Sequence, residues 1–445
     1  MTIRRLMATE DLAARFLEAA AGRTAQAEVH VVSSDSSNIN FTAGRVRAVD
    51  AAQRVNVSLR VINNGKLGFY TTTDTSDPAD AVERALEAAD KGQQADFDFP
   101  GPSDGPDPNT FADETASLTQ QALVSRGEAL LGIVGEANPD VVVDGNLSSR
   151  IEATALLNSS GCRVARETTP VTVFLSADRV RESDVASVYS FYSACRLGDD
   201  LDRIAHDLLQ TFRWAEENTS IKSGQMPVVL NPRLAQVLLM TIFMGVDGNN
   251  INRGVSPLAD RLGERVLDPR ISIVEDGTLD LWPSSCSHDS EGIPLRTTPI
   301  IEDGALKTFL YDLRAAAEAG VEPTGHGHRH PGYPPRVAPS NVVFRPAQQG
   351  SFQDLIADIE EGLYVEELIG VGNSNTIAGA FSNPVAMAFK IEKGEITGRV
   401  KDASIMGNVY DLLRDNLGGI SAETRRFGSL EAPFILLDNV NVASK

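Results

Sequence analysis

The fold of the second half of this chain is decided by residues 227–245, which read PVVLNPRLAQVLLMTIFMG. The run from Pro227 to Leu230 is apolar and typical of a short buried strand. Asn231 and Pro232 then supply a helix cap and a proline at the first helical position. From there to Gly245 almost every residue is apolar. The stretch therefore predicts a strand followed by a helix that is buried in the core of a domain.

Downstream of this helix, short strand-like runs alternate with glycine turns. The turns are Glu275-Asp276-Gly277, Glu302-Asp303-Gly304 and Lys393-Gly394. Helical patterns from Tyr311 to Ala319 and from Ser351 to Glu361 interrupt the strands, and Ser351 begins the second with the spacing of a capping box. This organisation predicts a curved, barrel-like sheet around the buried helix.

Upstream, residues 54–71 predict a β-hairpin. Val55, Val57, Leu59 and Val61 alternate with polar residues, and Asn63-Asn64-Gly65 supplies the turn. Further strands are predicted over the ranges 150–157, 162–168 and 171–176, which predicts a mostly antiparallel sheet.

Three helices are predicted in this half, of which the first two can cover one face of that sheet and the third closes the domain. One begins at a cap on Thr9, a second begins at Asp77-Pro78 and ends near Gly92, and a third carries an apolar stripe from Leu201 to Phe212. Residues 93–112 are rich in proline and glycine and are expected to form a loop. We therefore expect an α+β protein with a two-layer α/β domain over residues 1–222 and a β-rich domain over residues 223–445.

Composition and charge exclude several classes of protein. The chain of 445 residues carries 61 acidic and 40 basic side chains, a net charge of −21, so its composition disfavours direct binding of nucleic acid.

Its three cysteines, Cys162, Cys195 and Cys286, are far apart, which favours a reducing compartment over a disulfide framework. The N-terminus lacks the apolar core of a signal peptide, and no apolar run predicts a membrane span. We expect a cytoplasmic protein.

The candidates for chemistry are few. His326, His328 and His330 lie within five residues and are weak candidates for metal ligands, but no acid or cysteine beside them completes a tetrahedral set. The other histidines are isolated from any nucleophile in the sequence. Acid pairs such as Asp289 with Glu291 are interpreted as ordinary turn residues. The chain thus carries no complete catalytic motif of its own.

A series of segments in one order resembles the TldD/PmbA family, also known as modulators of DNA gyrase. The resemblance spans nearly the whole chain and is strongest in the second half. The segments are Val228 to Pro232, Asp289 to Pro294, Ile301 to Leu306 with Leu310 and Asp312, Pro323-Thr324-Gly325, Ser340-Asn341, Gly362 to Val365, Gly394-Glu395-Ile396 and Gly407-Asn408. The first half agrees more loosely, through Gly65 to Phe69 and Asn158 to Gly161.

The family has two kinds of member. In the TldD kind, the buried helix carries an HExxxH motif that supplies zinc ligands and a catalytic acid; the TldE/PmbA kind lacks it. Here the corresponding window reads Met240 to Gly245, so Met240, Thr241 and Gly245 replace the three functional residues. The segment Glu423 to Ser429 also resembles the PmbA kind. The resemblance thus implies a TldE/PmbA-type subunit with no catalytic residue and no metal of its own.

For such a subunit the resemblance implies a heterodimer with a TldD-type zinc peptidase that processes unfolded peptides. The zinc is expected in the partner, and a homodimer is an alternative state of the chain alone. Ala380 stands where PmbA-like members usually carry an acid, which leaves the peptide substrate open. Two other functions remain open at this point: a stand-alone metallohydrolase that uses the histidine loop, and an acidic protein that modulates a DNA enzyme such as gyrase.

Overall fold

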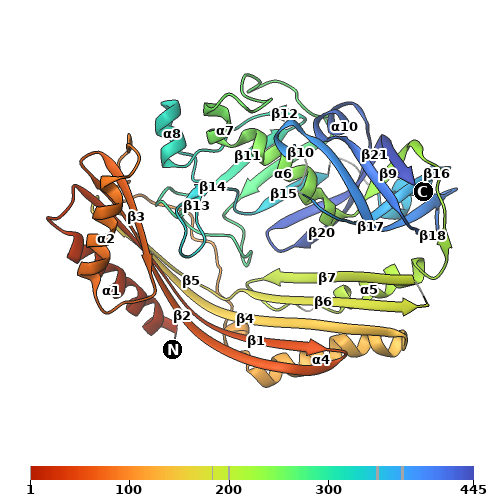
Figure 1. Ribbon diagram of the computed structural model, residues 1–445, viewed down its shortest axis with the longest axis horizontal. Helices are drawn as coiled ribbons and strands as arrows, with labels where there is room; N and C mark the ends of the chain where they lie inside the picture. Colours follow the sequence, from red (N-terminus) through yellow and green to blue (C-terminus); the bar gives the residue numbers. More distant parts are fainter. Residues whose placement is uncertain (1, 183, 199–200, 347–349, 372–374, 445) are drawn as a thin grey trace.

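A computed structural model describes residues 2–182, 184–198, 201–346, 350–371 and 375–444, and these residues form a mixed α+β fold with two sheets (Figure 1). The first sheet has seven strands. They are β1 (Gln26–Thr42), β2 (Arg45–Asn63), β3 (Lys66–Thr72), β4 (Val141–Asn158), β5 (Arg163–Thr168), β6 (Val171–Arg181) and β7 (Asp184–Ala194). The helices that accompany them are α1 (Thr2–Ala20), α2 (Pro78–Asp90), α3 (Asp113–Ala116), α4 (Gln120–Ala137) and α5 (Asp202–Trp214).

The first sheet is antiparallel, as predicted, and curves into a half-barrel in the order β3-β2-β1-β4-β6-β7, with β5 paired to β4. Side chains alternate between its faces. On β1, Val29 and Val31 pack against α1 and α2, which cover one end of the convex face in Figure 1. Their neighbours His30 and Val32 point to the concave face, which lies under the second domain.

The local predictions for this half are confirmed with one exception. Asn64 and Gly65 form the turn of the predicted hairpin with positive φ angles of 50° and 73°, and Asp77 caps α2. Thr9, however, lies inside α1, where its hydroxyl donates to the carbonyl oxygen of Arg5 at 3.0 Å. The predicted cap was therefore wrong, because a threonine hydroxyl bonds equally well to the preceding turn within a helix.

The second sheet has twelve strands. They are β8 (Asn218–Thr219), β9 (Gly224–Leu230), β10 (Ile271–Asp276), β11 (Thr297–Glu302), β12 (Ala305–Leu306), β15 (Val342–Pro346), β16 (Glu361–Leu368), β17 (Ala380–Glu392), β18 (Glu395–Val400), β19 (Ala403–Asn408), β20 (Leu417–Phe427) and β21 (Leu430–Ser444). A small separate ribbon joins β13 (Gly327–His328) and β14 (Arg336–Val337). The helices are η1 (Pro232–Leu234), α6 (Ala235–Val246), α7 (Gly248–Asn252), α8 (Leu313–Ala319), α9 (Phe352–Ile356), η2 (Thr376–Ala378) and α10 (Val409–Asp415).

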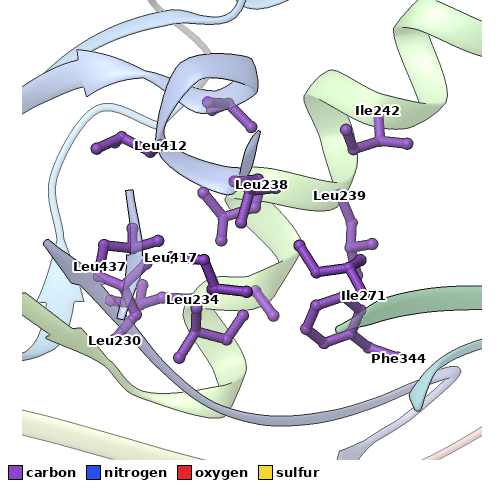
Figure 2. Close-up of a cluster of buried hydrophobic side chains, with 14 of the residues drawn as sticks. Leu230, Leu234, Leu238, Leu239, Ile242, Ile271, Phe344, Leu412, Leu417 and Leu437 are labelled. Carbon is purple, nitrogen blue, oxygen red and sulfur yellow. The ribbon is translucent and has the colours of Figure 1, made fainter. Parts of the chain in front are cut away.

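The predicted barrel is confirmed, since five strands close a ring. β21 pairs with β9, β9 with β16, β16 with β17, β17 with β19, and β19 returns to β21. Helix α6 packs into the same core as the inward-facing strand residues (Figure 2). Leu238 and Ile242 of this helix, and Leu234 of η1 before it, belong to one buried cluster with Leu437 of β21 and Leu412 of α10.

Two predicted elements of this domain differ from the structure. Helix α9 ends at Ile356 instead of Glu361, because Glu361 begins β16 and pairs with Glu392. Glu275 and Asp276 do not form an exposed turn. They end β10 with buried side chains, Glu275 at 1% exposure. The Glu275 carboxylate accepts the backbone N–H of Ser340, and the Asp276 carboxylate accepts from Thr278 and Thr297.

The two halves share a second core. It joins α4 and α5 to β16 and β17 and includes an aromatic cluster in which the Trp214 ring lies 5.5 Å from that of Tyr364 and 5.6 Å from that of Phe389. This shared core fixes the position of the concave sheet face against the barrel. Within the described residues, every helix is too short or too polar to cross a lipid bilayer.

Candidate functional site

One face of α6 lines an open groove of about 770 Å³ between the barrel and the first sheet. Leu239, Met240, Phe243 and Met244 supply its apolar floor, and Phe191 of β7 lies across from them. Met240, Phe243 and Met244 are only partly buried. The prediction that this helix is buried on all sides was therefore wrong on one face, because apolar side chains that line a groove give the same sequence pattern as a core.

The structure places only one of the three predicted motif-equivalent residues in this groove. Met240 lines it, whereas Thr241 is 2% exposed and faces the core. Gly245 also faces the core, where a Cβ atom would lie 2.5 Å from the Tyr410 hydroxyl oxygen and 2.9 Å from Cδ1 of Leu258. No side chain fits at residue 245 without displacement of these neighbours.

The donor set of the groove does not fit a zinc ion. Zinc in proteins is held by thiolate, imidazole and carboxylate groups. The α6 floor offers thioethers from Met240 and Met244, an amide from Gln236 and hydrocarbon. Asp247 is the carboxylate nearest the end of the helix, and its oxygen is occupied by the backbone N–H of Asn249 at 2.8 Å. The residues of this groove therefore do not fit a bound zinc ion.

The histidine loop is partly folded into the body of the protein. The Nδ1 atom of His326 lies 2.8 Å from the Thr324 hydroxyl oxygen, and its Nε2 atom lies 3.3 Å from a carboxylate oxygen of Glu275. His328 is half-buried and His330 is exposed. In the part of the chain that the structure describes, no group of three or more His, Cys, Asp or Glu side chains is arranged to hold a metal ion.

A buried ionic network joins the two domains behind this loop. Arg60 of β2 donates to both carboxylate oxygens of Glu28 on β1, at 2.9 and 2.7 Å, and to Glu291 of the second domain at 2.5 Å. Arg329 donates to Glu28 at 2.5 Å. Burial raises the pKa of Glu28, but the two guanidinium groups outweigh it and lower that pKa to about 2. Glu28 is therefore ionised at neutral pH and is paired with both arginines.

Segments that carry the family resemblance build the wall around this network. Both carboxylate oxygens of Asp289 accept backbone N–H groups, from Glu291 and Ile293 on one and from Gly327 on the other. Burial and the nearby Glu291 charge raise the pKa of Asp289 to about 7. Gly292 has φ +87° and leaves no room for a side chain, because a Cβ atom there would lie 2.8 Å from the Cys162 sulfur.

Asp289 and Glu291 lie at a turn, as predicted, in which the Gly292 N–H donates to the Asp289 carbonyl oxygen at 3.3 Å. Their side chains, however, are 4% and 2% exposed. The burial of Glu291 could not be predicted from nearby residues, because its cation, Arg60, lies 231 residues away along the chain.

With this geometry in place, comparison with known proteins identifies the class. Residues 223–444 match the PmbA/TldA metallopeptidase C-terminal domain, and residues 27–89 match domain 1 of the same metallopeptidases. The chain belongs to the PmbA/TldD family of metallopeptidases and their relatives.

Individual relatives agree over most of their length. A protein named as a metalloprotease from Methanothermobacter thermautotrophicus is 26% identical, covering 91% of this chain and 89% of that protein. The metalloprotease PmbA homologue of Haemophilus influenzae is 25% identical, covering 96% and 94%.

Solved structures share the whole fold. TldE from Thermococcus kodakarensis superposes with a TM-score of 0.86 at 24% identity and covers 99% of this chain and 100% of that chain. A candidate modulator of a DNA gyrase from Thermotoga maritima superposes with a TM-score of 0.87 at 25% identity and covers 98% and 100%. The half-barrel and the closed barrel are therefore the fold of this family.

Proposed function

We propose that this chain is the peptide-holding, non-catalytic subunit of a heterodimeric zinc metallopeptidase, and that a TldD-type partner carries the zinc. The observation that carries the proposal is the chemistry of the α6 groove. Met240, the first of the three motif-equivalent residues, lines this groove together with Phe243 and Met244, and none of these side chains can supply the imidazole or carboxylate groups that hold zinc. Thioether and aromatic side chains bind apolar groups of varied shape instead.

An extended peptide suits this groove. Its volume of about 770 Å³ accommodates several side chains. The first sheet carries a separate hollow of about 1060 Å³ that is lined largely by hydroxyl and amide groups. Among the described strands, β7 pairs with β6 alone, and its Phe191 lines the groove. On this strand the carbonyl oxygens of Tyr189 and Val185 already accept hydrogen bonds from Arg233 and Arg399, each at 2.8 Å. The other backbone groups of its outer edge are the ones that could hold an extended peptide without selecting its sequence.

The test is to purify the chain alone and together with a relative that carries HExxxH. We expect less than about 0.1 zinc per chain and no cleavage of an unfolded reporter peptide by the chain alone, because the donors on α6 are poor ligands. The pair should co-elute at one-to-one stoichiometry, hold zinc and cleave the reporter. Stoichiometric zinc in the chain alone, or cleavage by it, would refute the proposal.

A groove variant tests the holding role separately. Met240→Lys places a charge on the floor, and loss of about 1.4 kcal/mol of apolar contact should raise the KM of the complex for the reporter roughly tenfold. Met7→Lys is the matched control, because Met7 is 56% exposed on α1. An unchanged KM with Met240→Lys would show that the peptide does not use this groove.

A further inference from the structure

A polar cavity of about 300 Å³ lies between the concave face of the first sheet and the loops of the second domain. His30 of β1 and Arg166 of β5 form one side, and His328 and Arg329 form the other. The cavity and the α6 groove share one wall, residues 336–340, and Arg336 faces both. A ligand in the groove and a ligand in this cavity would therefore contact the same segment of the chain.

Three residues that line the cavity carry buried nitrogen atoms without partners among the described groups. Arg329 has a fully buried side chain whose Nη2 donates to Glu28 and to the carbonyl oxygen of Ser290, but whose Nε and Nη1 atoms bond to no described group. His30 Nδ1 and His328 Nε2 are likewise buried and unpaired. Buried polar atoms are almost always satisfied in folded proteins, so four of them around one cavity point to a ligand that supplies acceptors.

The charges that line the cavity favour an anion. Its walls carry the cations Arg166, Arg329 and Arg336 and the acids Glu152 and Asp289. Glu152 is already paired, with Arg150 at 3.1 Å, and Asp289 accepts three backbone N–H groups. Arg329 is likewise paired, with Glu28 at 2.5 Å, so Arg166 and Arg336 are the lining cations without an ion pair to a described acid. This cationic lining contrasts with a chain of net charge −21.

The two histidines of the cavity, His30 and His328, have lowered pKa values. Burial, and then the Arg329 charge, holds the pKa of His30 well below its usual range, and burial with the neighbouring His326 lowers the pKa of His328 to about 4. Both rings are neutral at physiological pH, so each has one N–H available to donate.

We propose that this cavity is an oxyanion-binding site in which Arg329, His30 and His328 donate to a carboxylate or phosphate group. The shared wall makes the carboxylate end of a peptide in the α6 groove the occupant that the geometry favours, and this part rests on the proposed function. The cavity is large enough for a carboxylate and one adjoining residue. Inorganic phosphate is the other source of the same chemistry.

The test uses the full chain alone and isothermal titration calorimetry. Three probes are compared: an apolar hexapeptide with a free C-terminal acid, the same peptide with a C-terminal amide, and inorganic phosphate. We expect the acid to bind at least tenfold more tightly than the amide, because charge-assisted hydrogen bonds to a desolvated carboxylate are among the strong ones.

Variants identify the donors. His328→Gln and Arg329→Gln should each weaken binding of the acid about 10- to 100-fold and leave binding of the amide unchanged. Arg329→Lys keeps the charge that pairs with Glu28 and serves as the second Arg329 variant if the glutamine variant does not fold. His206→Gln is the matched control, since His206 is exposed on α5 and its ring bonds only within that helix.

The outcomes separate the two claims. Equal binding of acid and amide, with phosphate bound in a manner that depends on Arg329, would overturn the peptide assignment and identify a phosphate site. Absence of binding by both the acid and phosphate would overturn the oxyanion site itself. Neither measurement needs the partner subunit or peptidase activity, so failure of the heterodimer leaves this result standing.

Discussion

Removal of the Arg60 guanidinium should strongly destabilise the contact between the two domains. Arg60 bridges Glu28 of the first domain and Glu291 of the second, and all three side chains are at most 3% exposed. Arg60→Leu keeps much of the side-chain volume but leaves both carboxylates without their shared cation. Breaking a buried pair from one side costs about 3–5 kcal/mol, because the remaining charge stays desolvated.

The pKa of Glu28 gives an independent value for the free energy that its ion pairs contribute to folding. It is about 2 in the folded protein against 4.5 for the free side chain. Each pH unit between the two values corresponds to about 1.4 kcal/mol, so ionised Glu28 contributes about 3 kcal/mol to folding at neutral pH. Arg329 still contacts Glu28 in the variant, so we expect a loss near the lower end of the range, about 3 kcal/mol.

The sign of the pH dependence follows from the lowered pKa. A carboxylate with a depressed folded-state pKa stabilises the protein above about pH 4.5, and this stability is lost as the pH falls toward 2. Without Arg60, the largest cause that lowers the pKa of Glu28 is gone, so the variant takes up this proton at a higher pH. The difference in stability between the two proteins should therefore narrow between pH 7 and pH 4.

Urea unfolding at pH 7, 5.5 and 4, followed by both tryptophan fluorescence and circular dichroism, measures this difference. Arg84→Leu is the matched control, because Arg84 is 53% exposed and its pair with Asp80 at 3.4 Å contributes little. We expect a change below about 0.5 kcal/mol for the control. A loss under about 1 kcal/mol at pH 7 for Arg60→Leu, or a difference that stays constant with pH, would refute the reasoning.

Two further predictions concern stability. In the same urea assay, Gly245→Ala should lower the free energy of unfolding by about 1–3 kcal/mol, because its Cβ atom overpacks against Tyr410, and adding Tyr410→Phe should recover part of this loss. Gly132→Ala on α4 is the matched control. Its Cβ atom meets no described atom within 4 Å, so it should raise the free energy of unfolding by up to about 1 kcal/mol. The pKa of His328, lowered to about 4, makes the folded protein lose up to about 2 kcal/mol between pH 7 and pH 5, since the unfolded chain takes up that proton first. His328→Gln should remove this part of the pH dependence, and an unchanged slope would show that the ring is protonated in the folded state.

Most predictions that depended on neighbours in the sequence were confirmed, apart from the cap at Thr9 and the end of α9. The hairpin over residues 54–71 and the helix α5 follow from alternation and from a 3.6-residue stripe, which are set by which face of each element meets the core. The cap at Asp77 also follows from local geometry, since its side chain bonds to the backbone three residues on. The resemblance of ordered segments to one family was equally a property of the sequence, and the matched domains confirm it.

The exposure or burial of particular side chains depended on distant residues and was not predicted. An apolar helix has the same pattern whether its outer face meets protein or a groove, so the exposure of Met240 and Met244 could not be predicted. Asp289 and Glu291 have the composition of a turn, and nothing near them reveals that both are buried.

The sequence by itself determined that this chain is an α+β member of a metallopeptidase family. It also determined that the central helix of this chain carries methionine at residues 240 and 244. Only the tertiary structure decided where the polar groups act. Glu28, Arg60, Glu291 and Arg329 come from four distant segments, and each is tolerated inside the protein only because the others are there. The free energy of a buried charge depends on its partners in space, and the curved sheet and the barrel bring those partners together across hundreds of residues.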